Sequence, residues 1–218
     1  MGHAEFIPIL LKGAAISLLI AAASSLVAVM LAFIAGLARL SPFRTMRWAA
    51  ACYVECFRGT SLLVQLFWMF YVLPHFGILL PPYVVAVAAL GLNMGAYGSE
   101  VVRGAIVSVP HVQIEATIAL NMTKRLAMRR ILLPQALLTM LLPAGNLLII
   151  LFKSTSIVSL ITIHDLAFNA YNLNIQTFAT VPIYLSTLLI YFVIAQAIAL
   201  SVAALYRALD RGRSGRLA

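Results

Sequence analysis

The run GAAISLLIAAASSLVAVMLAFIAGLA, residues 13–38, contains no Asp, Glu, Lys, Arg or His. A helix needs about 20 consecutive apolar residues to cross a hydrocarbon core about 30 Å thick, so this run is long enough to span a membrane. A cleaved signal peptide would have a shorter apolar core and a basic start, whereas Glu5 precedes this run. The run therefore predicts a helical membrane protein.

The composition of the whole chain points the same way. Of its 218 residues, 63% are hydrophobic and 10% are charged, against about 45–50% and about 25% in soluble domains. This excludes a soluble enzyme, a disordered chain and a secreted disulfide scaffold. In lipid a backbone must satisfy its own hydrogen bonds, so the spans are expected to be helices. We expect one transmembrane domain over residues 1–218, with five spans at about 13–38, 49–73, 81–102, 131–152 and 182–206.

The net charge of +9 is accounted for by membrane topology. With five spans, 13 of the 15 basic residues fall on one side of the membrane, and only Lys12 and Lys153 fall on the other. The positive-inside rule then places the N-terminus outside and the C-terminus in the cytoplasm. Some of these side chains are expected to contact anionic membrane lipid. No nucleic-acid recognition module accompanies the charge, so no nucleic-acid partner is expected.

The segment SVPHVQIEATIALNMTKRLAMRR, residues 108–130, is too polar for a span and too patterned for a simple turn. Pro110 favours the start of a helix, with Glu115 in its first turn, where the helix dipole stabilises a carboxylate. A second short helix is expected over residues 124–130. The segment therefore predicts a cytoplasmic elbow of two helices between the third and fourth spans. The alternative is a helix that lies on the inner leaflet.

Several motifs resemble those of ABC importer permeases. The EAA loop of these proteins is similar to Glu115-Ala116 with Asn121, followed by Leu133-Pro134. The "RGTPLLVQ" segment of the polar amino acid (histidine/glutamine-type) permeases is similar to RGTSLLVQ at residues 58–65. Further matches in the same order are Ala96-Tyr97 through Glu100, Arg103-Gly104, Leu133-Pro134-Gln135-Ala136 and Lys153-Ser154-Thr155-Ser156, and the resemblance covers about residues 8–207.

The resemblance implies an all-α membrane protein with the type I ABC importer (MetI-like) permease fold, in the bacterial plasma (inner) membrane. It also implies a non-enzymatic subunit without cofactors, and the chain carries no G-x-x-x-x-G-K-[ST] loop for ATP. The partners that it implies are an ABC ATPase subunit in two copies, a second permease chain (identical or paralogous), and a periplasmic or lipid-anchored solute-binding protein.

In the family the elbow is the coupling helix that docks on the ATPase. The residues that carry this role over by position, or are plausible apolar anchors beside it, are Glu115, Ala116, Leu120, Asn121 and Met122. Where Asn121 stands the family usually has Gly, at a turn that requires a left-handed residue. Asn is the next most tolerant residue there, so the elbow is expected to form.

The solute path is expected among polar groups inside apolar spans, because such groups are costly in lipid and face a cavity or a partner. The candidates are Gln65, Asn93, Tyr97, Asn146, Lys153 and Ser154. For the three amides the alternative is hydrogen bonding between helices. For Lys153 it is a boundary lysine that reaches the membrane surface, as opposed to a cation that receives the solute's carboxylate. Glu100 and Arg103 are expected to pair.

More than one class of solute fits the sequence. Ser154 replaces an acidic residue of many relatives, which weakly disfavours cationic amino acids and favours neutral polar amino acids or a zwitterion of the ectoine kind. The polar stretch 157–181 could form a short helix and loop that faces a binding protein, or a cap over the pore. A methionine-type importer permease shares the coupling loop and stays an alternative.

Two other classes of protein remain as alternatives. A stand-alone secondary carrier or channel is disfavoured because five spans show no inverted repeat. A membrane-embedded enzyme is disfavoured because G-x-S-x-G and H-E-x-x-H are absent. Cys52 and Cys56 lie one helical turn apart with no His or further Cys nearby, so neither a metal site nor a catalytic site is expected.

Overall fold

The computed structural model describes residues 6–214, and this part of the chain contains helices and no strand. The α-helices are α1 (Phe6–Arg39), α2 (Arg44–Gly59), α3 (Leu62–Phe67), α4 (Pro82–Val107), α5 (His111–Ala119), α6 (Lys124–Ala127), α7 (Leu133–Ser154), α8 (Leu166–Thr177) and α9 (Thr180–Ser214). Short π-helical or 3-10 segments extend them at Trp68–Val72, Leu73–Phe76, Met128–Leu132 and Thr155–Ile161.

Four helical stretches are long and apolar enough to cross a membrane: Phe6–Arg39, Pro82–Val107, Lys124–Ile161 and Thr180–Asp210. The fifth span is a bent pair, in which α2 and the helical segment Leu62–Phe76 meet at an angle of 102°. The five-span count therefore holds with the bent pair taken as one span.

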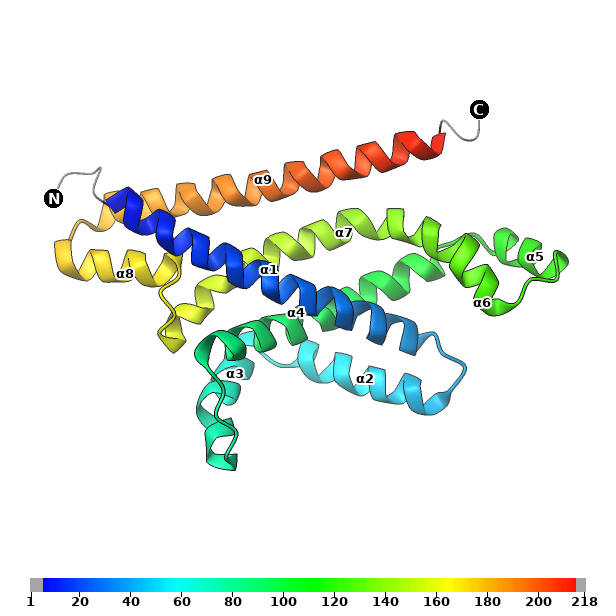
Figure 1. Cartoon of the computed structure of the whole chain (residues 1–218), viewed down its shortest axis with the longest axis horizontal. Helices are drawn as coiled ribbons and strands as arrows, with labels where there is room; N and C mark the ends of the chain where they lie inside the picture. Colours follow the sequence, from blue (N-terminus) through cyan, green and yellow to red (C-terminus); the bar gives the residue numbers. More distant parts are fainter. Residues whose placement is uncertain (1–5, 215–218) are drawn as a thin grey trace.

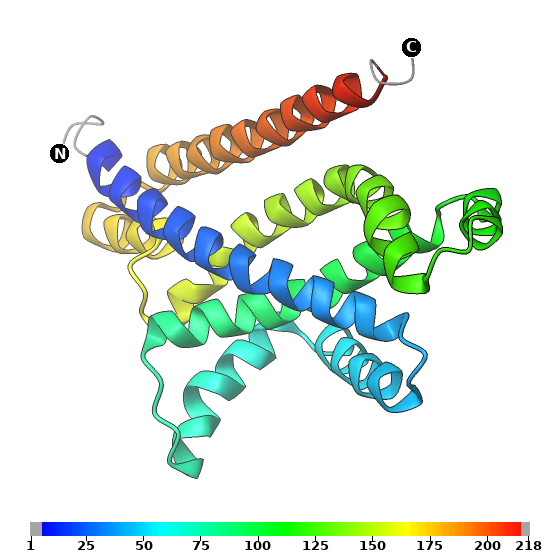
Figure 2. The same cartoon turned by 45° about the vertical axis from the view of Figure 1, so that its right-hand side comes forward.

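The single helix expected over residues 49–73 is interrupted after Gly59. Thr60 and Ser61 adopt extended backbone angles, and the Thr60 hydroxyl donates a 2.7 Å hydrogen bond to the carbonyl of Cys56. Short polar side chains compete in this way with the helical pattern of the backbone. Beyond the break, α3 and its extensions project from the body on the side opposite α9 (Figures 1 and 2).

The body of the molecule is built on the close crossing of α1 and α4. A Cβ atom added to Gly91, Gly95 or Gly98 of α4 would lie 2.7–2.8 Å from a side-chain atom of α1. Small residues let membrane helices approach until their backbones nearly touch, and this contact replaces the hydrophobic driving force that lipid does not provide. These glycines therefore fix the frame on which the other helices are arranged.

The remaining helices surround this frame. Helix α7 stays helical through Pro143 and packs between α4 and α9. Helix α8, the short helix expected within residues 157–181, lies beside the N-terminal half of α1 and the start of α9 (Figure 1). Helices α5 and α6 form an elbow at the opposite end of the molecule, beyond α4 and α7 (Figures 1 and 2).

Candidate coupling surface and solute path

The elbow forms where the sequence places it, with one difference in detail. Pro110 precedes α5, which starts at His111 and contains no acidic residue in its first turn. Glu115 therefore lies in the second turn, and the expectation that it sits in the first turn is wrong. The helix dipole acts mainly within the first turn, so it stabilises the Glu115 carboxylate only weakly. This carboxylate is exposed and available to a partner.

The turn after α5 confirms the expectation for Asn121. Its φ of 51° is in the left-handed region, and the chain reverses there through two hydrogen bonds. The Leu120 N–H donates to the Ala116 carbonyl at 3.0 Å, and the Met122 N–H donates to the Thr117 carbonyl at 3.0 Å. The second bond closes the wider ring typical of helix ends with a left-handed residue.

The elbow is tied to a membrane helix by side chain and by backbone. Gln135 of α7 donates a hydrogen bond from Nε2 to the Oε1 of Gln113 of α5. On the other side of the turn, the Thr123 hydroxyl accepts a 3.3 Å bond from the Leu126 N–H and caps α6. Helix α6 then runs into α7 through the π-helical turn Met128–Leu132. Helix α5 is therefore linked to α7 directly by a side-chain hydrogen bond and, through the turn and α6, by the backbone.

The face of the elbow is apolar and exposed. Val112, Ile118 and Leu120 expose 73%, 70% and 71% of their surface. Glu115, Ala116 and Asn121 are also exposed, and Met122 is half-buried. The elbow lies beyond the ends of the long helices (Figure 1), and its exposed apolar side chains are candidates for contact with a protein or with the membrane.

Two of the solute-path candidates are joined where the second span breaks. Asn93 of α4 is 3% exposed, and its Nδ2 donates to the Phe57 carbonyl at 2.9 Å and to the Gln65 Oε1 at 3.1 Å. The Gln65 Nε2 in turn donates to the Phe57 carbonyl at 2.9 Å and to the Thr60 Oγ1 at 2.6 Å. For these two amides the interhelical alternative describes what the structure shows.

A cluster of charges lies about two to three turns further along α4. The expected pair of Glu100 and Arg103 forms at 3.0 Å, and Glu100 also pairs with Arg39 of α1 and with Arg58 of α2. The guanidinium of Arg58 lies 5.2 Å from the ring centroid of Tyr97. The sequence places Arg39 and Arg58 among the basic residues that orient the chain in the membrane and does not pair either of them with Glu100. Arg39 is the last residue of α1 and Arg58 the second-last of α2, and basic residues at these two helix ends were the signal that could have revealed partners for Glu100.

The candidates on α7 do not join this group. Asn146 and Lys153 are exposed, and Ser154 donates a 2.9 Å hydrogen bond to the Ile150 carbonyl of its own helix. All three ion pairs in the described part of the chain meet at Glu100, so Lys153 has none there. A single chain therefore does not bring the six candidates into one site.

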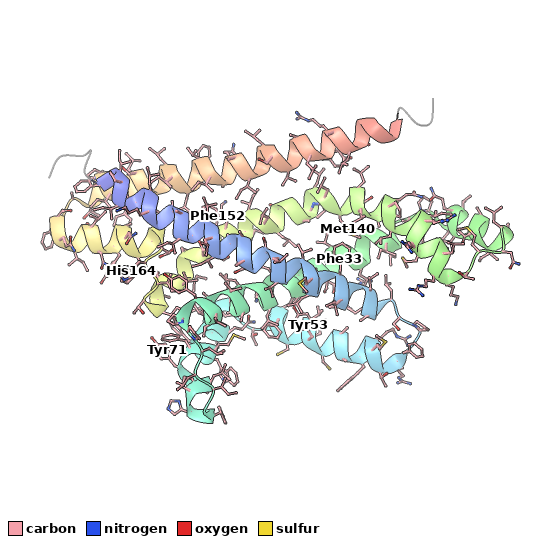
Figure 3. The ribbon with its side chains drawn as sticks, in the orientation of Figure 1. Phe33, Tyr53, Tyr71, Met140, Phe152 and His164 are labelled. Carbon is pink, nitrogen blue, oxygen red and sulfur yellow. The ribbon has the colours of Figure 1, made fainter. Side chains whose placement is uncertain are left out.

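One cavity of about 410 Å³ lies between α1, α4, α7 and α9. Phe33 of α1 and Met140 of α7, both labelled in Figure 3, line it together with Met94 and Gly98 of α4. None of the six solute-path candidates lines this cavity. Within the described residues no group of His, Cys, Asp and Glu side chains could hold a metal ion, and Cys52 and Cys56 are free and exposed.

Residues 7–215 match a protein family described as binding-protein-dependent transport system inner membrane component. The chain belongs to this family. As a permease component it is a transport protein rather than an enzyme, and its all-α fold is the importer fold that the sequence motifs implied.

Individual proteins that the permease resembles are also transporter permeases. It is 43% identical over 190 residues to a probable amino-acid ABC transporter permease protein, y4tF, of Sinorhizobium fredii, with 84% of this chain and 80% of the relative covered. It is 38% identical over 208 residues to the L-cystine transport system permease protein TcyB of Bacillus subtilis, with 95% and 89% covered. Among solved structures, an amino acid ABC transporter crystallised with histidines superposes with a TM-score of 0.89 at 30% identity, over 94% of this chain and 96% of the other.

Proposed function

We propose that this permease moves polar, zwitterionic amino acids into the cell, driven by ATP hydrolysis in a separate ATPase subunit that docks on the α5–α6 elbow. The observation that carries the proposal is the combination of exposed apolar side chains on the elbow, including Leu120, with a hydrogen bond from Gln135 of α7 to Gln113 of α5. Such a surface can bind a partner and pass its movement to a membrane helix. Glu115, Ala116, Asn121 and Met122 complete the docking surface.

We further propose that the pore contains a second permease chain, identical or paralogous, and that two ATPase copies serve the pair. Tyr97, Asn146 and Lys153 are exposed on the isolated chain, although all three lie within long apolar helices. Polar groups that face lipid are costly. A second chain that encloses a shared aqueous path beside these residues removes that cost, and the apolar cavity within one chain offers no such path.

The bias of basic residues supports an orientation with the N-terminus outside and the C-terminus in the cytoplasm. This orientation places the elbow in the cytoplasm, where an ATPase works, and α8 on the outer face, where a periplasmic or lipid-anchored solute-binding protein docks. Labelling of single cysteines with a membrane-impermeant maleimide tests it, in a background without Cys52 and Cys56. Tyr171→Cys should react in intact cells and Ala119→Cys only after lysis, and the reverse pattern would contradict the orientation.

The proposed solute class rests on the relatives and on two residues of α7. The amino-acid and L-cystine permeases are the relatives described above. Lys153 supplies a cation for a carboxylate, and Ser154 leaves no negative charge beside it for a basic side chain. Neutral polar amino acids fit this pair best, and a zwitterion of the ectoine kind is the second candidate.

The decisive experiment is uptake into proteoliposomes that contain the permease, its ATPase and its binding protein. Uptake of a labelled neutral polar amino acid should require ATP on the elbow side and should exceed uptake of arginine, with ectoine measured in parallel. Glu115→Lys should abolish uptake, while Arg44→Lys, Arg44→Glu and the unaltered chain serve as controls away from the elbow. Uptake that follows an ion gradient and ignores ATP would instead identify a secondary carrier.

A further inference from the structure

Asp165 is a fully buried carboxylate in the connection between the fourth and fifth spans. It is 0% exposed, and it precedes α8, whose first turn it caps by accepting a 2.9 Å hydrogen bond at Oδ1 from the Phe168 N–H. Its second oxygen, Oδ2, is buried and has no hydrogen-bond partner within residues 6–214. Buried polar atoms are nearly always paired, so this oxygen requires an explanation.

Polar side chains from three other elements surround it. The hydroxyl of Tyr191, on α9, is buried and also without a hydrogen-bond partner in the described chain. Ser17 of α1 and Thr155 of the 3-10 segment lie near that hydroxyl, and Asp165 acts on it electrostatically. Ser17 and Thr155 are both 0% exposed. Four elements therefore meet at one small polar cluster, which we call the α8 seam: Ser17, Thr155, Asp165 and Tyr191.

Hydrogen bonds and close packing hold α8 against α1 beside this seam. The Leu166 N–H at the start of α8 donates a 3.2 Å hydrogen bond to the Ser17 Oγ. Asn169 of α8 donates a 3.3 Å bond to the Ile9 carbonyl of α1. A Cβ added to Gly13 of α1 would lie 2.8 Å from the Asp165 carbonyl oxygen. The carboxyl group is thus confined at a closely packed junction.

No ion pair among the described side chains neutralises the carboxylate. Among the described side chains, the titratable groups on the elements around it are Lys12 and Arg39 of α1, Lys153 of α7, His164, Tyr171 of α8, and Tyr184, Tyr191, Tyr206, Arg207 and Asp210 of α9. None of the ion pairs in residues 6–214 involves Asp165. Both lysines are exposed, and His164, labelled in Figure 3, stacks on Phe168 with ring centroids 4.5 Å apart. A buried charge without a counter-ion is strongly disfavoured relative to the neutral form.

We propose that Asp165 is a proton-binding site, and that binding of the proton stabilises the packing of α8 against α1 and α9. With the proton bound, Oδ2 becomes a donor, and the hydroxyl oxygens of Tyr191 and Ser17, which belong to the same cluster, can accept its hydrogen bond after a small adjustment of the side chains. Without the proton, the seam holds an unpaired buried charge, and α8 opens more often to hydrate it. At acidic pH, α8 therefore opens less often.

The direction of the pH effect follows from linkage. Burial raises the pKa of Asp165 from 3.8 to about 6, against the opposing effect of the backbone bonds that it accepts. A carboxyl group whose pKa is raised in the packed state binds its proton more tightly there than in the opened state. The stabilisation is therefore complete below pH 3.8 and is lost as the pH rises through about 6.

Hydrogen–deuterium exchange of α8 in the full-length permease in lipid nanodiscs tests the proposal. After correction for intrinsic exchange rates, the amides of α8 should exchange about tenfold more slowly at about pH 5 than at about pH 7.5. Asp165→Asn and Asp165→Ser both keep a good helix cap and cannot titrate, so their α8 amides should show no such difference. The amides of α5, far from the seam, report any general effect of pH.

Two outcomes would overturn the proposal. The first is a pH difference of equal size in Asp165→Asn or Asp165→Ser, which would locate the titrating group elsewhere. The second is slower exchange of α8 at constant pH on replacing an organic cation by sodium, which would identify the bound cation as a metal ion. The measurement uses neither uptake nor ATP hydrolysis, so its result is independent of the proposed transport function.

Discussion

Asn93 of α4 donates a hydrogen bond of 3.1 Å to Gln65 of α3, and its same nitrogen donates to the Phe57 carbonyl at the end of α2. The last carbonyls of a helix have no partner within that helix, and the break after Gly59 leaves such carbonyls at membrane depth. One side chain of an unbroken helix thus satisfies the end of α2 and orients the start of α3.

Replacing Asn93 by Leu should destabilise the permease. The substitution keeps a similar volume but removes both hydrogen bonds and leaves Gln65 Oε1 without this donor, for an expected cost of about 1–3 kcal/mol. The measurement is the midpoint of thermal unfolding in nanodiscs. Ser25→Ala is the control, because that hydroxyl bonds only the Ala22 carbonyl of its own helix. Equal midpoints for the two variants would mean that packing alone holds the bent span.

Replacing Glu100 by Gln should also lower the unfolding midpoint, because three guanidinium groups then lie together without a counter-charge. The cluster is partly exposed, so we expect about 1–3 kcal/mol, below the range for a fully buried pair. Among the arginines, Arg39→Gln should cost more than Arg103→Gln, since their side chains are 19% and 39% exposed. Equal costs, or a cost that high salt removes entirely, would show that burial does not strengthen the cluster.

The long spans and the elbow could be predicted because their signals are local. A charge-free run such as residues 13–38 specifies a membrane helix wherever it packs. The turn at Asn121 follows from the backbone that the turn requires and from the few residues that tolerate it. In both cases the chemistry that decides the structure lies within a few residues of the feature.

The break in the second span and the clusters around Glu100 and Asp165 depend on distant residues. The sequence beyond Ser61 is as apolar as a continuous helix would be, and the Phe57 carbonyl at the break is bonded by Asn93, on another helix, as well as by the nearby Gln65. Likewise Arg39 is 61 residues from its partner Glu100. Contacts between such distant residues depend on how the helices cross, and the residue pattern within one helix does not determine the crossing.

The contact between α7 and α9 gives a prediction about packing. A Cβ added to Gly145 would overlap with Val202 Cγ1, and Val is stiff because its side chain branches at Cβ. Gly145→Ala should therefore cost about 1–3 kcal/mol by overpacking. Adding Val202→Ala should recover part of this loss. In a double-mutant cycle of unfolding free energies, obtained from the shifts in the unfolding midpoint, the coupling energy should be about 0.5 kcal/mol or more. Strictly additive effects would show that α9 moves aside freely.

The left-handed turn at Asn121, itself part of the proposed docking surface, allows the geometry of the elbow to be tested separately from added bulk on its face. Gly adopts a φ of 51° without cost, so Asn121→Gly should keep ATP-driven uptake. A β-branched residue is strained there by about 1–2 kcal/mol, so Asn121→Val should shift the orientation of α5 and reduce uptake several-fold while the chain still inserts. Ala119→Val places the same side chain on a right-handed residue of α5 and should have the smaller effect. If it reduces uptake as much as Asn121→Val, then added bulk on the docking face, rather than the geometry of the turn, limits transport.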